Sequence, residues 1–131
     1  MDGARDANPA PGFGEHPEHR VTIARTGERL RAGFRGRVVA DSRHALVVHE
    51  TGYAPVVYFP AADVRQDWLK PTDRRTYCPF KGHARYWTLL VDGHRADNAV
   101  WSYPRPYDEA GALRGHYAFY AGRIDGVDVP A

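Results

Sequence analysis

The segment "TYCPFKGHARYW", residues 76–87, carries the only cysteine of the chain. Pro79 follows Cys78 and favours a tight turn with the proline at its second position, so Lys81, the fourth residue, is expected close to the sulfur. A nearby ammonium group favours the thiolate, which is the nucleophilic form of cysteine. This spacing makes Cys78 and Lys81 candidate catalytic residues for acyl or group transfer.

An unreactive cysteine explains the same residues. Free cysteine is among the most often buried residue types and is commonly inert, and Lys81 can point from a loop tip into solvent. A thiol nucleophile also needs a base, and none of the seven histidines stands in a recognisable local pairing with Cys78. Both interpretations stay open.

A second group of residues indicates a ligand pocket. In "NAVWSYPRPY" an amide, an indole and a phenol precede a proline-stiffened loop, a combination that suits a small polar, partly aromatic ligand. The predicted ligand-binding residues are Tyr58, Arg75, Trp87, Asn98, Trp101 and Tyr103. Arg75 and Lys81 favour an anionic group, and the rings favour a planar portion. The alternative is that these rings fill the core, as strand aromatics more often do.

The sequence gives no support for a metal site, a phosphate-binding loop or a serine nucleophile. His16 and His19 have a spacing that can bind zinc, but no second cysteine stands nearby, so no metal site is predicted. The phosphate-binding patterns GxxxxGK[ST] and GxGxxG do not occur, and neither Ser42 nor Ser102 lies in a GxSxG elbow. No cofactor can be assigned.

The elements that must position these residues are predicted to be short antiparallel strands. Alternating or β-branched segments separated by glycine-containing and "DG" turns are typical of hairpins. They are "HRVTIA", "ERLRAGFRGRVVADS", "ALVVHE", "VVYF", "ARYWTLLV", "HRADNAVW" and "GHYAFYAGRI". One helix is expected between Pro60 and Leu69, with Pro71 ending it. The predicted fold class is mainly β, a compact single-domain antiparallel sheet or barrel-like fold with one or two short helices.

The length and composition of the chain limit its possible domain organisation and partners. A chain of 131 residues is expected to form one domain, with residues 1–18 as a flexible N-terminal arm and residues 19–131 as a single β-rich domain. Its 18 basic and 16 acidic residues give a formal charge of +2 without basic clusters, so no nucleic-acid partner is expected. No segment approaches the length of a membrane span, which excludes a membrane partner, and a cytoplasmic location is predicted.

Four motifs occur in order along the chain: "YFP" at 58–60 with "DV" after it, T-x-C-P-x-K-G-x-A-x-Y-W at 76–87, N-x-A/V-W-x-Y-P at 98–104, and G-x-x-A-F-Y at 115–120. From about residue 20 to residue 125 the sequence closely resembles the domain-of-unknown-function family numbered 427. Two positions depart from its pattern: Phe80, often Tyr, and Asp97, often Glu. The resemblance implies a compact β-rich domain with a groove into which the motifs converge, and it implies no activity.

The function predicted from these features is a small-molecule-binding domain of unknown activity, with an aromatic, cation-containing groove for a small anionic or aromatic ligand. One alternative is an enzyme of the acyl- or group-transfer type that uses Cys78, Lys81 or both. Another is a structural or assembly module whose aromatic surface forms a homodimer.

Overall fold

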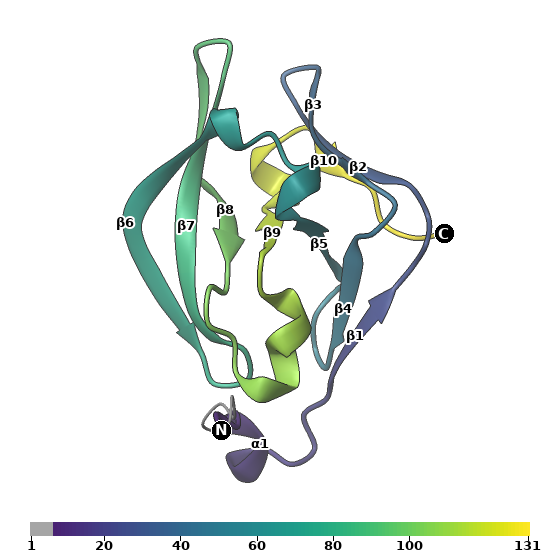
Figure 1. The fold of residues 1–131 in the computed structure, drawn as a ribbon, viewed down its shortest axis with the longest axis vertical. Coiled ribbons are helices and arrows are strands. Elements are labelled where there is room, and N and C mark those ends of the chain that lie inside the picture. The colour runs from purple at the N-terminus through teal and green to yellow at the C-terminus, as the bar shows by residue number, and fades with distance from the viewer. Residues whose placement is uncertain (1–6) are drawn as a thin grey trace, which may run out of the picture.

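Ten strands in two antiparallel sheets make up the fold in a computed structural model, which describes residues 7–131 (Figure 1). The seven-stranded sheet has the order β1-β4-β5-β9-β8-β7-β6, and the three-stranded sheet has the order β10-β2-β3. The strands are β1 (Val21–Arg25), β2 (Leu30–Phe34), β3 (Arg37–Ser42), β4 (Leu46–Glu50), β5 (Val56–Pro60), β6 (Leu69–Cys78), β7 (Gly82–Val91), β8 (His94–Ser102), β9 (His116–Phe119) and β10 (Gly126–Val127). The mainly β fold class is confirmed.

Two hairpins have turns that their sequences encode. Asp92 and Gly93 join β7 to β8 with φ values of 51° and 81°, and Arg35 and Gly36 join β2 to β3 with 53° and 77°. Positive φ at both central residues defines a turn whose twist matches that of the flanking strands. These turns set the register of the hairpins that project at one end of the molecule in Figure 1.

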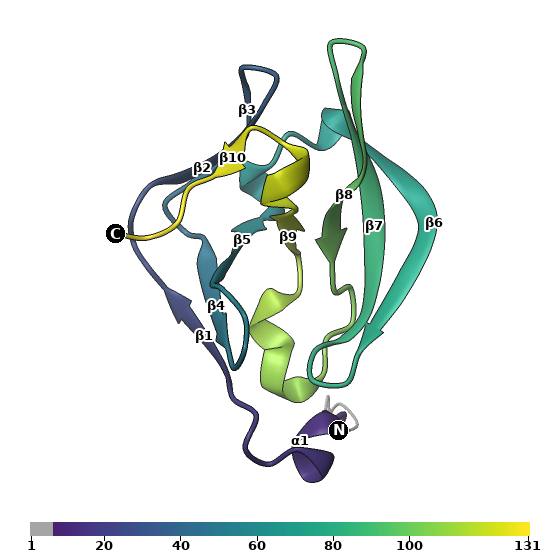
Figure 2. The ribbon, with the colours of Figure 1, turned by 180° about the vertical axis from the view of Figure 1, so that it is seen from behind.

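Strand β9 unites the two halves of the large sheet. It pairs with β5 on one side, where Phe59 is opposite Tyr117, and with β8 on the other, where Trp101 is opposite Ala118. Figures 1 and 2 show β9 between these two strands in views from opposite sides. Strand β9 therefore lies between β5 and β8, two strands that are far apart in the sequence.

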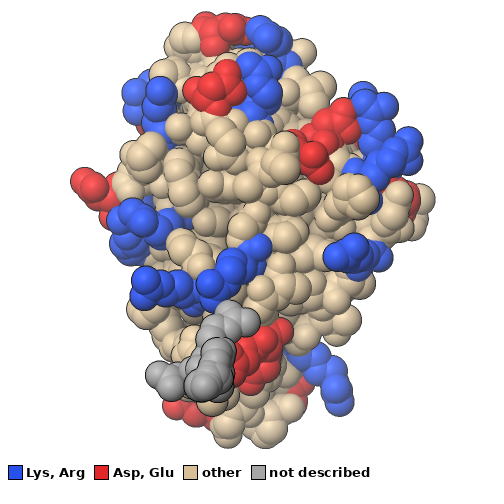
Figure 3. All heavy atoms as spheres, viewed as in Figure 1, with Lys and Arg blue, Asp and Glu red and all other residues tan. Residues whose placement is uncertain are grey.

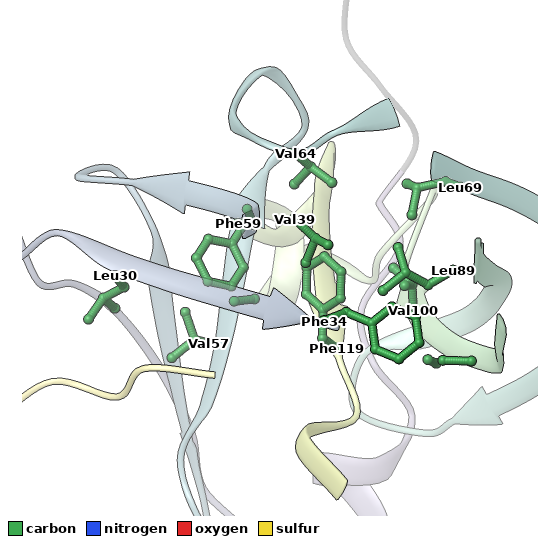
Figure 4. Close-up of a cluster of buried hydrophobic side chains, with 14 of the residues drawn as sticks. Leu30, Phe34, Val39, Val57, Phe59, Val64, Leu69, Leu89, Val100 and Phe119 are labelled. Atoms are coloured by element: carbon green, nitrogen blue, oxygen red, sulfur yellow. The ribbon is translucent and has the colours of Figure 1, made fainter. Parts of the chain in front are cut away.

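The middle strands of the large sheet are buried on both faces, whereas its edge strands β1 and β6 are largely exposed. Along β5, Val57 and Phe59 face a core cluster shared with the small sheet, whereas Tyr58 faces a second cluster. The same alternation occurs along β4, as expected of a strand whose successive side chains point to opposite faces. The first cluster is shown in Figure 4, where Phe59 and Phe119 lie among aliphatic side chains. The second cluster surrounds the site described below.

The prediction of one helix between Pro60 and Leu69 is wrong. This segment instead forms two 3₁₀ turns, η1 (Ala61–Asp63) and η2 (Gln66–Trp68), separated by extended backbone. Val64 makes a β-bridge to Ala40, and the Arg65 N–H donates to the Val39 carbonyl at 2.9 Å. These hydrogen bonds to β3 take the place of the continuous series of backbone hydrogen bonds that a helix requires. The other helical elements are α1 (Gly12–Glu15), η3 (Asp108–Leu113) and η4 (Ala121–Arg123).

The N-terminal segment contacts the domain from Asn8 onward; residues 1–6 of the expected arm lie outside the described residues. The Asn8 N–H donates to the Asp108 carboxylate and the Ala10 N–H donates to the Glu109 carboxylate, both at 2.8 Å. The Gly12 N–H donates to the Pro79 carbonyl at 3.0 Å. Within residues 7–131, no helix is long and apolar enough to cross a membrane.

Candidate functional site

A cavity of about 170 Å³ lies within the second cluster, between β4, β5, β7 and β8. Tyr53 is 70 % exposed, whereas Tyr58 and Lys81 are buried, so the cavity runs from the surface into the domain. The complete lining consists of Val48, Glu50, Tyr53, Ala54, Val56, Tyr58, Lys81, Tyr86, Trp101, Tyr103 and Tyr120. Six of these eleven side chains are aromatic, which makes the walls flat and hydroxyl-rich.

The aromatic walls are held in fixed orientations. The Trp101 Nε1–H donates to the Tyr58 hydroxyl at 3.1 Å, and the two rings meet edge to face. Trp101 also packs on Tyr120 with 4.4 Å between ring centres. Tyr86 and Tyr120 are nearly parallel, and their hydroxyl oxygens lie 3.4 Å apart. Hydrogen bonds and ring contacts of this kind keep a binding surface in place before a ligand arrives.

The buried end of the cavity carries a chain of three ionisable groups. Lys81 is 6 % exposed, and its Nζ donates to Glu50 Oε1. The second oxygen of Glu50 lies 2.8 Å from His19 Nε2, and the His19 ring stacks on Phe80 at 3.9 Å. Charges in such positions need partners because of the cost of desolvation. Lys81 and Glu50 neutralise each other, so the ammonium does not meet a ligand as an isolated positive charge.

Cys78 lies beside the cavity and not in its lining. The expected turn is present: the Lys81 N–H donates to the Cys78 carbonyl at 3.3 Å, and Lys81 Nζ lies 4.0 Å from Cys78 Sγ. Gly82 follows with φ of 122°, and an added Cβ there would come within 3.3 Å of the Arg105 carbonyl. The half-buried Cys78 packs against the second cluster.

The cavity phenols differ in acidity because their surroundings differ. Burial raises the pKa of Tyr58 and of Tyr103, so both stay protonated far into the alkaline range. Burial also raises the pKa of Tyr120, with a contribution from the Tyr86 hydrogen bond, to about 12. Burial acts in the same direction on Tyr86, but hydrogen bonds from Thr76 and Tyr120 and the charge of Arg74 outweigh it and lower the Tyr86 pKa.

The sequence matches the model of the family described as Domain of unknown function (DUF427) over residues 22–130, which is most of the chain. The chain belongs to the DUF427 family. The search of curated proteins found no match. The family description carries no activity, so the function has to be argued from the site itself.

All four of the motifs noted in the sequence contribute to the cavity. Residues 58–60 provide Tyr58, and residues 76–87 provide Lys81 and Tyr86. Residues 98–104 provide Trp101 and Tyr103, and residues 115–120 provide Tyr120. These segments lie on β5, β6, β7, β8 and β9 or at the ends of those strands, so the order of strands in the sheet brings them together.

Of the predicted site residues, Tyr58, Lys81, Trp101 and Tyr103 line the cavity. Trp87 does not, because it is next to Tyr86 on a strand and therefore lies on the opposite face, where it packs edge to face on Tyr117.

Asn98 and Arg75 also lie outside the cavity. Asn98 has φ of 51° at an irregularity of β8, and its side chain accepts a hydrogen bond of 2.6 Å from Thr72 on β6. Arg75 is exposed and donates to the Thr72 and Arg74 carbonyls at 3.0 Å and 2.9 Å. Both side chains thus stabilise the irregular part of β6, where the register with β7 shifts between Pro71 and Arg75.

Glu50 and Tyr53 are lining residues that the sequence analysis did not single out. The signal for Glu50 was present in "LVVHE", since Glu50 has the same parity as Leu46 and Val48 and so shares their buried face. A carboxylate on a buried face needs a positively charged partner, and Lys81 is that partner. Among residues 7–131, no three His, Cys, Asp or Glu side chains are grouped so as to hold a metal ion.

Proposed function

We propose that this protein binds a small planar molecule in the cavity between Tyr58, Tyr86, Trp101 and Tyr120. The observation that carries the proposal is the convergence of six aromatic side chains on one cavity with a buried, paired lysine at its inner end. A few polar groups on largely aromatic walls are the usual composition of a small-molecule site.

The volume limits the size of the ligand. A cavity of about 150 Å³ in another protein accepts benzene, and the cavity here measures about 170 Å³. One ring with a short substituent therefore fits, and a nucleotide does not. The parallel and edge-on arrangement of the rings favours a flat ligand because aromatic groups prefer offset-stacked and edge-to-face contacts.

The polar groups favour a substituent that accepts hydrogen bonds. Lys81 has three N–H donors, of which one is used by Glu50 and a second is directed at Cys78 Sγ, and the cavity hydroxyls of Tyr58, Tyr86 and Tyr120 add further donors. Reaction at Cys78 is not part of the proposal, since the sulfur lies outside the lining. We also propose a cytoplasmic location, which the single free cysteine supports.

Binding can be followed through tryptophan fluorescence, because Trp101 lines the cavity and Trp87 lies on the other face of the sheet. In a panel of single-ring compounds, a ligand should change the emission of the wild type and of Trp87→Phe equally. Trp101→Phe should lose this signal, and calorimetry should show affinity weakened about tenfold, since the bond to Tyr58 is lost. Equal binding by Trp101→Phe and the wild type, or no binding at millimolar concentration, would contradict the proposal.

A further inference from the structure

We propose that the ligand of this cavity is an aromatic anion, whose ring lies among the tyrosines and whose charge is held by Arg74 and Arg123. This inference rests on the proposed function and adds the chemical class of the ligand. It differs from the sequence-based expectation, which assigned the anion to Lys81 and Arg75.

Two guanidinium groups lie against the aromatic wall. The guanidinium carbon of Arg74 is 4.9 Å from the centre of the Tyr86 ring, and that of Arg123 is 5.0 Å from the centre of the Tyr120 ring. Both arginines are exposed, whereas both tyrosines line the cavity. The two positive charges therefore lie over rings that line the cavity, close enough to act on an anionic group bound at those rings.

No carboxylate among residues 7–131 forms an ion pair with either of these charges. Among residues 7–131, the ion pairs of arginine with carboxylates involve Arg29, Arg37, Arg65 and Arg95, and neither Arg74 nor Arg123 takes part. Arg123 Nη1 donates to the Asp97 carbonyl at 2.7 Å, which orients the group without cancelling its charge. Inside the cavity the charges are balanced, because the Glu50 carboxylate neutralises the Lys81 ammonium group.

This distribution of charge distinguishes a cationic ligand from an anionic one. An aromatic cage alone suits a quaternary ammonium ion, because the faces of the rings attract cations. Here guanidinium groups already occupy positions near the rings of Tyr86 and Tyr120, and a ligand cation would be repelled by them. A carboxylate would be attracted instead, and guanidinium is the side-chain group best suited to bind it.

The hydroxyls of Tyr86 and Tyr120 add donors at the same place. Their oxygens lie 3.4 Å apart, and the charge of Arg74 opposes the effect of burial on the acidity of both phenols. The charge of Arg74, 4.9 Å from the centre of the Tyr86 ring, therefore acts on both hydroxyls and would also attract a carboxylate bound beside them.

The test compares benzoate, benzamide and phenyltrimethylammonium, which share one ring and differ in charge. Calorimetry on the full chain should give the tightest binding for benzoate. Arg74→Ala and Arg123→Ala should each weaken benzoate about tenfold and leave benzamide unchanged. Arg75→Ala is the matched control, since its guanidinium binds backbone carbonyls of β6, and it should bind benzoate like the wild type.

Binding of benzamide or phenyltrimethylammonium as tightly as benzoate would overturn this inference and leave the proposed function standing. So would unchanged benzoate affinity in both arginine variants. Absence of binding for all three probes would overturn the inference and the proposed function together.

Discussion

Lys81 serves the cavity and the fold through the same contact. Its ammonium group forms part of the cavity lining, and its bond to Glu50 satisfies a carboxylate that is itself largely buried. His19 meets the other oxygen of that carboxylate, so β4, the β6–β7 turn and the N-terminal segment are joined at one point. A change at Lys81 therefore affects stability as well as binding.

We expect Lys81→Met to lower the free energy of unfolding by about 3–5 kcal/mol, because it leaves the Glu50 charge buried without its main partner. Urea denaturation at pH 7 measures the change. Lys70→Met, at the only other lysine and on an exposed site, should stay within about 0.5 kcal/mol of the wild type. The double variant Glu50→Gln/Lys81→Met should recover part of the loss. A small effect of Lys81→Met alone would show that the ion pair contributes little.

The unequal acidity of the cavity phenols predicts a staged alkaline titration. Tyr86 should ionise before Tyr120, which ionises near pH 12, and Tyr58 and Tyr103 only after both. Since the phenolate is the charged form, a cation that favours it lowers the pKa.

Absorbance of tyrosinate against pH measures the order. Tyr86→Phe should remove the transition that precedes the one of Tyr120, and Arg74→Ala should move it to higher pH, because the charge that lowers the Tyr86 pKa is gone. Arg75→Ala should leave it unchanged. A titration that is the same in Arg74→Ala and the wild type would show that Arg74 does not act on this ring.

At the residue scale, four of the eight site residues predicted from the sequence line the cavity. Residue type and the Cys-Pro turn were sufficient to find them: Tyr58, Lys81, Trp101 and Tyr103. Choosing between Tyr86 and Trp87 required knowing which face of β7 meets the cavity, and residue type alone does not tell the two faces apart. Glu50 could have been found from its parity with buried neighbours.

At the scale of elements, turns were predictable and tertiary pairing was not. "DG" correctly indicated the β7–β8 hairpin because only a few residue types accept positive φ at both turn positions. The segment after Pro60 satisfied helical spacing, yet β3 offers it a bridge at Ala40, and the chain stays extended at Val64. Hydrogen bonds to a strand distant in sequence cannot be read from local periodicity.

The docking of the N-terminal segment depends on a close approach at Gly12. A Cβ at this position would lie 2.6 Å from the Phe80 ring and 2.9 Å from the Pro79 carbonyl, whereas one at Gly14 would meet nothing within 4 Å. Phe80 also contacts Phe13 edge to face and stacks on His19. Gly12 therefore allows the segment to lie directly on the Cys78–Lys81 turn.

We expect Gly12→Ala to cost about 1–3 kcal/mol of stability through overpacking and to speed amide exchange in residues 7–18. Gly14→Ala is the matched control and should leave exchange in this segment at the wild-type rate. Hydrogen exchange followed by mass spectrometry on both variants makes the comparison. Equal protection of the segment in the two variants would show that the contact with Phe80 does not hold it.

At the scale of the whole molecule, order along the chain differs from order in the large sheet. The neighbours β1–β4, β5–β9 and β9–β8 are formed across loops or whole hairpins, and these pairings bring the cavity residues together. Local pattern indicated that strands exist but not which strand lies next to which. The charges on the face shown in Figure 3 are mixed in sign, so on that face they do not specify a partner.

The sharing of one core by both sheets predicts that they unfold together. Phe59 is fully buried on β5, packs edge to face on Phe119 with 5.8 Å between ring centres, and belongs to the cluster that contains Leu30 and Phe34 of the small sheet. Its neighbour Tyr58, on the other face of the same strand, lines the cavity. A defect at Phe59 should therefore weaken the small sheet, the large sheet and the cavity at the same time.

We expect Phe59→Ala to lower the free energy of unfolding by about 3–5 kcal/mol, the usual cost of removing a buried phenylalanine side chain. Val38→Ala, at a position that is 47 % exposed on β3, should change it by less than about 0.5 kcal/mol. Urea denaturation should be followed by far-ultraviolet circular dichroism for the strands and by tryptophan fluorescence for the cavity. If the fold is one cooperative unit, the two curves coincide in the wild type and shift together in Phe59→Ala. Fluorescence that kept its wild-type midpoint while the dichroism midpoint fell would mean that the cavity half is stable without the shared core.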